Sequence, residues 1–361
     1  MRELLRLHNL PVYQNRMYDT AEEARACIRG DVVLAQDEIT GLISNISFDP
    51  GKLEYDENYQ NEQGYSSVFQ SHLSEVMSII NRHFQAMRIL EIGCGKGSFL
   101  ELLLKEGHDA IGVDPAYEGN APHIIKAAFD SKLGVSGEAI IMRHVLEHIP
   151  GPLAFLESVK QANAGQGLIY IEVPCLDWIL DNRVWFDIFY EHVNYFRLSD
   201  LKRIFGNVVE SGYLFGGQYI YIIADLETLE NPIKLREWIP ATISDDFFIG
   251  IENCLISCNR EKQCVVWGAG AKGVMFCNHA IARGLAIDFV IDISPAKQGK
   301  FMAATGLKVL SPNDALAQML PGADIIVMNS NYLAEVQSLA GPNYHYTIAD
   351  KILATSDAVY A

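Results

Sequence analysis

The clearest hydrophobic pattern of the chain lies between Met87 and Asp114. A short apolar run from Met87 to Ile92 predicts a strand, and a glycine-rich segment follows it. Apolar residues then recur at helical spacing from Phe99 to Leu104, and Ala110 to Val113 predicts a second strand. The order of strand, glycine turn, helix and strand is typical of one half of a nucleotide-binding α/β unit.

Further strands and helices alternate on both sides of this unit. Apolar residues on one helical face predict a helix from Val68 to Phe84. We also expect a short helix after Asp114 and a later helix from Leu198 to Phe205 with Ser199 as its N-cap. The other principal strands are predicted at Glu138 to Met142, Gly167 to Val173, Val208 to Phe215, Tyr219 to Ala224, Cys264 to Trp267, Ile287 to Ile291 and Ala323 to Met328.

This succession predicts an α/β fold with two Rossmann-like, doubly wound domains. We place a small N-terminal region at 1–66, the first α/β domain at 67–228, a polar helical bridge at 229–262 and a smaller second domain at 263–361. A chain of 361 residues is long enough for two such cores.

Composition restricts the classes of partner. The chain has 28 Lys and Arg against 45 Asp and Glu, a net charge of −17, which disfavours nucleic acid and anionic membranes as partners. We see no N-terminal signal segment and no apolar run of the roughly 18 to 20 residues that cross a bilayer. We therefore expect a cytoplasmic protein, a monomer or a weak homo-oligomer. The seven cysteines form no pair of CxxC motifs, so we predict no metal site and no disulfide framework.

Two acids flank the first glycine turn, which contains Gly93, Gly95 and Gly97. Asp114 follows the turn by about 20 residues, where an acid holds ribose hydroxyls. Glu91 precedes the turn and suits a ligand with a cationic amino acid portion better than a pyrophosphate. We therefore predict S-adenosylmethionine as the cofactor, with a dinucleotide as the alternative. Three further residues are expected beside the cofactor: Phe129, Asp130 and His144.

Two later segments carry a second group of candidate residues. Arg143 to His148 follows one predicted strand, and Cys175 to Arg197, which is dense in aromatic and ionisable residues, follows the next. Ligands of open α/β sheets bind at the carboxyl ends of the strands. Both segments are therefore predicted to lie over the pocket.

Several stretches together resemble class I S-adenosylmethionine-dependent methyltransferases, and within them the deoxysugar (nucleotide-sugar) C-methyltransferases. They are the Glu91 to Asp114 pattern, MRHVLEHIPGPLAFLESV, GLIYIEVP, FDIFYEHVNYF, VVWGAGAKG, VIDISPAKQGKF and ADIIVMNSNYLAEV. The resemblance runs from about Tyr55 to the end of the chain, and YEHVNYF and SPAKQGK are its most specific parts. It implies the same two Rossmann-like domains and an activity on nucleotide-linked sugars.

The N-terminal region departs from this family. Members usually begin with a small domain in which four cysteines bind zinc, whereas only Cys27 precedes residue 90 here. We expect that the zinc is absent and that the domain is shortened or rebuilt.

C-methylation of a keto sugar requires a base that removes the proton next to the ketone and donors that face the enolate oxygen. His192 is our leading base, because a neutral imidazole near pH 7 suits this task. Glu191 is expected to orient that ring or to contact the sugar. By resemblance, His148 is the second histidine of the pocket. Tyr190 is assigned to the enolate oxygen, although the family's tyrosine corresponds to Phe189.

Two groups of residues are predicted to hold the acceptor. By resemblance, Tyr59 or Tyr65 reaches the pocket from the preceding segment. In the second domain, the spacing of Gly268, Gly270 and Gly273, with Asp292 about 20 residues later, by itself predicts an NAD site. The resemblance instead implies a domain without its own redox cofactor that helps to hold the nucleotide sugar. The cations expected at the diphosphate are Lys272, Lys297 and Lys300.

The sequence therefore predicts an S-adenosylmethionine-dependent methyltransferase that acts on a nucleotide-linked deoxy or keto sugar, at carbon, through a histidine base. One alternative is an O- or N-methyltransferase of a sugar or another small metabolite. A second is an NAD-dependent oxidoreductase that uses the C-terminal glycine turn. A third is a module that binds a sugar nucleotide without turnover.

Overall fold

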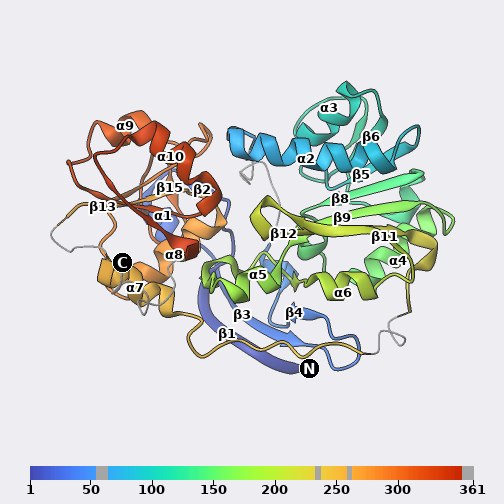
Figure 1. Ribbon diagram of the computed structural model, residues 1–361, viewed down its shortest axis with the longest axis horizontal. Coiled ribbons are helices and arrows are strands. Elements are labelled where there is room, and N and C mark those ends of the chain that lie inside the picture. Colours follow the sequence, from blue (N-terminus) through green and yellow to red (C-terminus); the bar gives the residue numbers. More distant parts are fainter. Residues whose placement is uncertain (54–63, 232–236, 258–261, 352–361) are drawn as a thin grey trace, which may run out of the picture.

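A computed structural model describes residues 1–53, 64–231, 237–257 and 262–351. Two α/β units lie side by side, and an N-terminal sheet lies against both of them (Figure 1). The α/β class and the two parallel-strand sheets confirm the predicted fold. No helix among the described ranges is long and apolar enough to cross a membrane.

The first unit contains a seven-stranded sheet in the order β11-β12-β9-β8-β5-β6-β7. Strands β12, β11 and β9 pair antiparallel, and the others pair parallel. Helices α2 and α3 cover one face, and α4 and α6 cover the other (Figure 1). The strands are β5 (Arg88–Ile92), β6 (Asp109–Val113), β7 (Ile124–Ile125), β8 (Ala139–Arg143), β9 (Leu168–Pro174), β11 (Val208–Leu214) and β12 (Tyr219–Asp225). The helices are α2 (Ser67–His83), α3 (Ser98–Lys105), α4 (Pro152–Ala162), α5 (Leu176–Asp181) and α6 (Leu198–Arg203).

The second unit contains a five-stranded parallel sheet in the order β16-β14-β13-β17-β18. Its strands are β13 (Cys264–Trp267), β14 (Phe289–Ile291), β16 (Val309–Leu310), β17 (Asp324–Val327) and β18 (His345–Ile348). Its helices are α7 (Ile249–Ser257), α8 (Ala271–Ala282), α9 (Pro312–Leu316) and α10 (Leu333–Ala340). Both sheets direct the carboxyl ends of their central strands towards a common pocket.

The N-terminal region joins the two units. Its sheet has the order β1-β3-β4-β10, and β10 (Asn194–Tyr195) comes from the first unit. Strand β2 (Met17–Tyr18) instead pairs with β15 (Phe301–Met302) of the second unit. The remaining elements are β1 (Arg2–Pro11), α1 (Ala21–Arg25), β3 (Arg29–Gln36) and β4 (Ile43–Asn45).

Three predictions about local structure are wrong. No helix follows Asp114, where a tyrosine hydroxyl accepts a backbone bond from Ala121 and holds a turn instead. The N-cap of α6 is Arg197, not Ser199. Within the described part of 229–262, only α7 is an α-helix. The rest of the described part forms no strand or α-helix, and the side chains of Gln36 and Arg197 donate hydrogen bonds to the backbone oxygen of Ile239.

Candidate active site

A cavity of about 240 Å³ lies between the two α/β units. Its wall combines the loops after β8 and β9, the glycine turn before α8, and the ends of β14 and β17. Of the residues singled out in the sequence, the wall contains Tyr65, His144, His148, Glu191, His192, Gly268, Gly270, Lys272, Gly273 and Lys297. The pocket therefore collects residues that are more than 200 positions apart in the chain.

The loops that carry His148 and His192 are bonded to each other. The Nδ1 of His148 lies 2.9 Å from the backbone oxygen of Glu191, and the Val193 N–H donates to the backbone oxygen of Glu147 at 2.7 Å. The two imidazole rings are 4.9 Å apart, edge to face. Because a carbonyl oxygen only accepts, His148 carries a proton on Nδ1.

The chemical state of His192 follows from its surroundings. The residue is only 7% exposed, and Phe189 packs against its ring at a centroid distance of 4.0 Å. Burial is the main cause, followed by the repulsion that two protonated imidazoles, His148 and His192, would exert on each other, and together they lower the pKa of His192 well below the ordinary value. Burial also lowers the pKa of His148. Both imidazoles are therefore neutral at pH 7, the form in which a histidine accepts a proton.

A different environment surrounds His144. Its φ is +53°, and its ring lies between two carboxylates, 3.4 Å from Glu147 and 3.3 Å from Glu172. Burial opposes protonation, but the two carboxylates outweigh it and raise the pKa of His144 to about 9. The pocket wall thus carries an imidazolium beside two neutral imidazoles.

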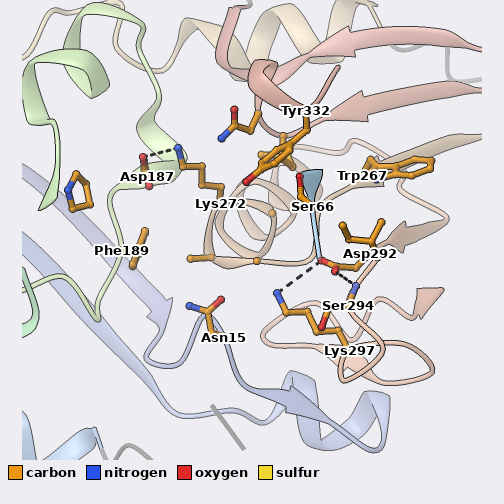
Figure 2. A pocket seen from close by; sticks show the side chains of 18 of the residues that line it. Asn15, Ser66, Asp187, Phe189, Trp267, Lys272, Asp292, Ser294, Lys297 and Tyr332 are labelled. Carbon is orange, nitrogen blue, oxygen red and sulfur yellow. Dashed lines mark hydrogen bonds and ion pairs between the residues drawn. The ribbon is translucent and has the colours of Figure 1, made fainter. Parts of the chain in front are cut away.

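The N-terminal region holds Glu191 in place. The carboxylate accepts a 2.7 Å hydrogen bond from the Gln14 backbone N–H, and both residues are fully buried. The next residue, Asn15, lines the cavity between Phe189 and Lys297 (Figure 2). No motif marks Gln14 or Asn15 in the sequence, and their contribution appears only when the N-terminal segment is folded.

The structure places Tyr190 away from the cavity. Its hydroxyl accepts a hydrogen bond from the Asp49 backbone at 2.9 Å, and its ring covers Gly30, where a Cβ would overlap it. Phe189 occupies the cavity wall instead. The contacts with Asp49 and Gly30 turn Tyr190 away from the wall that Phe189, Glu191 and His192 share. The assignment of Tyr190 to the enolate oxygen is therefore corrected.

The first glycine turn forms a polar cradle after β5. The Gly95 and Ala116 backbone N–H groups each donate a 2.8 Å hydrogen bond to Asp114, one to each carboxylate oxygen. Glu91 is 3% exposed, and its Oε2 has no hydrogen-bond partner within the described structure. Burial raises the pKa of Glu91 to about 7 despite the opposing charge of Arg143. These residues fit the cation and the ribose of S-adenosylmethionine.

Two of the residues predicted beside the cofactor, Phe129 and Asp130, differ in placement. Phe129 is half-buried and packs edge to face on Phe155 at 6.0 Å. Asp130 is exposed, and its carboxylate accepts the Lys132 backbone N–H at 2.8 Å as an N-cap. The Asp130 side chain is therefore engaged in local turn structure.

The second glycine turn repeats the arrangement of the first. The Ala269 and Ser294 backbone N–H groups each donate a 2.8 Å hydrogen bond to Asp292. The amino end of α8 opens on the cavity, and the Lys297 ammonium lies 3.8 Å from Asp292 (Figure 2). An unobstructed helix amino end with an adjacent ammonium suits an anionic ligand.

The other predicted cations are engaged elsewhere. The Lys272 ammonium reaches the cavity but lies 2.9 Å from Asp187 and donates to Gln218 at 3.0 Å. Lys300 lies outside the cavity wall and pairs with exposed Asp19 at 3.6 Å, which corrects its assignment to the acceptor. Tyr65 lies on the wall with 55% exposure, and Tyr59 falls outside the described residues.

Two groups of side chains each place nitrogen or oxygen atoms that could bind a metal ion within 4.8 Å of one another. They are Glu147, His148 and His192, and His72, His144 and Glu172. In the second group, Glu172 is already bound by the Arg143 guanidinium at 2.9 Å, which leaves little capacity for a metal ion. The absence of a bound metal stays a prediction.

In a comparison with known proteins, each of the two units matches a family model. Residues 67–208 match the family described as a methyltransferase domain, and residues 250–339 match the family described as a C-methyltransferase C-terminal domain. The chain is similar to the C-methyltransferase NovU of Streptomyces niveus, with 33% identity over 133 residues, 32% of this chain and 31% of the relative. It is also similar to a ubiquinone biosynthesis O-methyltransferase of Dinoroseobacter shibae, with 34% identity over 92 residues, 21% of this chain and 37% of the relative.

The matches to these two curated relatives span only about a third of each relative's length. Among solved structures, a SAM-dependent methyltransferase from Archaeoglobus fulgidus matches with 20% identity and a TM-score of 0.35, over 44% of this chain and all of that one. The PH0226 protein of Pyrococcus horikoshii matches with 15% identity and a TM-score of 0.36, over 48% of this chain and 99% of that one.

Proposed function

We propose that this chain, which unites a methyltransferase domain with a C-methyltransferase C-terminal domain, methylates a carbon atom of a nucleotide-linked keto sugar. The observation that carries the proposal is the neutral histidine pair, His148 and His192, in a cavity bounded by both units. One unit offers the cradle at Glu91 and Asp114, and the other offers the amino end of α8 with Lys297.

The cofactor in this proposal is S-adenosylmethionine, which when bound supplies an electrophilic methyl group. The protein residues act on the acceptor. His192 removes the proton from the carbon next to the ketone, and the electron pair left on that carbon is the nucleophile that the methyl group of the bound cofactor would alkylate. The His144 imidazolium supplies positive potential on the wall where the enolate charge develops. Glu191, held by Gln14, stays beside the base.

The acceptor spans both units in this proposal. Its sugar faces the histidine pair, and its diphosphate faces the α8 amino end and Lys297. Asp292 accepts a ribose hydroxyl, because each of its oxygens retains a second lone pair after accepting one backbone N–H.

Calorimetry and isotope exchange test the proposal separately. The purified protein should bind S-adenosylmethionine, and absence of binding of both this cofactor and S-adenosylhomocysteine would contradict the assignment. In D₂O, the enzyme should introduce deuterium next to the ketone of a nucleotide-linked keto sugar, and His192→Ala should stop this exchange. Methyl transfer without exchange and without dependence on His192 would support an O-methyltransferase instead.

The similarity to ubiquinone biosynthesis O-methyltransferases favours this O-methyltransferase as the second candidate. Binding measurements test the two remaining alternatives, the NAD-dependent oxidoreductase and the module that binds a sugar nucleotide without turnover. Fluorescence titration with NADH would detect the oxidoreductase, and a sugar nucleotide that binds without turnover would indicate a binding module.

A further inference from the structure

We propose that Glu147 is a positioning residue for the reaction, as the counter-ion of the proton that His192 takes from the acceptor. This inference rests on the proposed function, because it presupposes a histidine base. Glu147 precedes His148 directly in the loop after β8 and reaches the cavity wall.

The Glu147 side chain is a buried carboxylate without a hydrogen bond. The residue is 1% exposed, and neither carboxylate oxygen has a hydrogen-bond partner within the described structure. Its nearest charged neighbour is the His144 ring, 3.4 Å away. The His144 imidazolium is an ion-pair partner, but neither oxygen accepts a hydrogen bond, and a buried carboxylate without one is costly, so its retention calls for an explanation.

The position of Glu147 supplies that explanation. A carboxylate oxygen of Glu147 and ring nitrogens of His148 and His192 lie within 4.8 Å of one another. The Val193 N–H fixes the Glu147 backbone at 2.7 Å, and the Asn194 amide donates to the backbone oxygen of Leu146 at 2.9 Å. The carboxylate is therefore held beside the histidine pair by bonds that run between the two catalytic loops.

The charge balance around the pair supports the same role. Several charged or titratable groups touch His192 or are paired with its neighbours, and they come from the loops after β8 and β9, from the neighbouring strands and from α8. They are Arg143, His144, Glu147, His148, Glu172, Asp187, Glu191, Tyr195 and Lys272. With His144 protonated, this group contains four carboxylates and three cations, so it carries one excess negative charge.

This excess is cancelled when His192 gains a proton. Asp187 pairs with Lys272 and Glu172 pairs with Arg143, whereas Glu147 lies beside both the His144 imidazolium and the histidine pair, so it is the carboxylate placed to offset the proton on His192. Replacing Glu147 with glutamine would make the resting group neutral and the protonated group cationic. In a buried site, the protonated base would then be disfavoured.

The test compares Glu147→Gln with Glu157→Gln, a matched change at an exposed position on α4. Deuterium exchange next to the ketone is measured against pH, together with the melting temperature and S-adenosylmethionine binding. In Glu147→Gln, we expect the rate of deuterium exchange to fall about tenfold. The acidic limb of the profile of exchange rate against pH should move down by about 1 to 3 pH units, because the anion that favours protonated His192 is lost. Cofactor affinity should stay unchanged. Glu157→Gln should match the wild type in every measurement.

Glu147→Asp keeps the charge and separates the proposal from a folding defect. It should place the acidic limb between those of the wild type and Glu147→Gln. If the acidic limb of the exchange profile does not shift in either Glu147→Gln or Glu147→Asp, the inference is overturned, whatever the exchange rate of the variants. Loss of wild-type exchange on treatment with a chelator also overturns it, since the cluster would then be a metal site. A wild type that binds cofactor but exchanges no deuterium refutes the histidine base itself, and with it the proposed function.

Discussion

Replacing Glu172 with glutamine should destabilise the protein strongly, although the change is nearly isosteric. Glu172 lies on β9 and is fully buried. It binds three donors: Arg143 Nε at 2.9 Å, the Tyr170 hydroxyl at 2.9 Å and His72 Nε2 at 2.8 Å. A glutamine would leave the Arg143 charge uncompensated and would place an amide N–H₂ against at least one of these donors.

A natural control exists on the same sheet. Glu210 on β11 also binds an arginine, a histidine and a tyrosine, with Arg82 at 2.6 Å, His83 at 2.7 Å and Tyr221 at 2.6 Å, but its side chain is 27% exposed. Breaking a buried charge pair from one side costs about 3 to 5 kcal/mol. The corresponding pair at a solvated site contributes about 1 kcal/mol or less. Burial is the principal difference between the two sites.

The assay is denaturant unfolding of both variants at pH 7, followed by circular dichroism and tryptophan fluorescence. Glu172→Gln should lose about 3 to 5 kcal/mol of unfolding free energy, and Glu210→Gln about 1 kcal/mol or less. A Glu172→Gln variant within 1 kcal/mol of Glu210→Gln would refute the reasoning, since it would mean that the buried network adjusts to the lost charge.

The pH dependence of this stabilisation has a definite sign. Burial would raise the pKa of Glu172, but Arg143, His144 and His72 outweigh it and hold the pKa well below the ordinary range. A lowered folded pKa stabilises the protein above the unfolded value of about 4.3, and this contribution disappears as pH falls through the folded pKa. The difference between wild type and Glu172→Gln should therefore be constant near neutral pH and shrink below about pH 4.

Three further predictions follow from the two glycine turns and from Tyr190. Asp114→Asn should weaken S-adenosylmethionine binding at least about tenfold in calorimetry, equal to about 1.4 kcal/mol. Asp292→Asn, at the carboxylate with the same backbone bonds in the second unit, should leave cofactor binding unchanged. Equal effects of the two changes would contradict the assignment of the cofactor to the first unit. Tyr190→Phe should keep the turnover rate within about threefold, because it loses only a hydrogen bond of about 1 kcal/mol, and a hundredfold loss would restore this residue to the active site. Gly273→Ala should lower the melting temperature more than Gly284→Ala. A Cβ at residue 273 would overlap the Gly268 carbonyl, whereas a Cβ at residue 284 would have open space and only the strain of a positive φ. The reverse order of melting temperatures would show that the α8 turn rearranges freely.

The two Rossmann-like units were predictable because their signals are local. The apolar runs at β5, β6, β8 and β13 and the glycines between strand and helix lie within about 30 residues, so periodicity and spacing identify them. The matched families confirm the resemblance read from those motifs. The roles assigned to the individual site residues stay predictions.

The other residues of the pocket could not be predicted, because their positions depend on contacts between segments that are distant in the sequence. Nothing in the sequence near Gln14 or Asn15 indicates that Glu191 and the cavity lie beside them, because the hydrogen bond between Gln14 and Glu191 joins positions 177 residues apart. The orientation of Tyr190 failed for a related reason. Its side chain is held by Gly30 and by the Asp49 backbone, 141 positions earlier in the sequence, so no local pattern shows that it faces away from the pocket.

The short ladder between β2 and β15 restricts how this protein can be recombined with its relatives. Phe301 pairs with Tyr18 and Met302 with Met17, and the Ala304 N–H donates to the Ala24 carbonyl at 2.9 Å. A chimera joined between 229 and 262 would exchange the second α/β unit but retain a foreign strand at its edge. Exchange of acceptor specificity by domain transplantation should therefore succeed only when residues 12–25 are transferred together with the second unit.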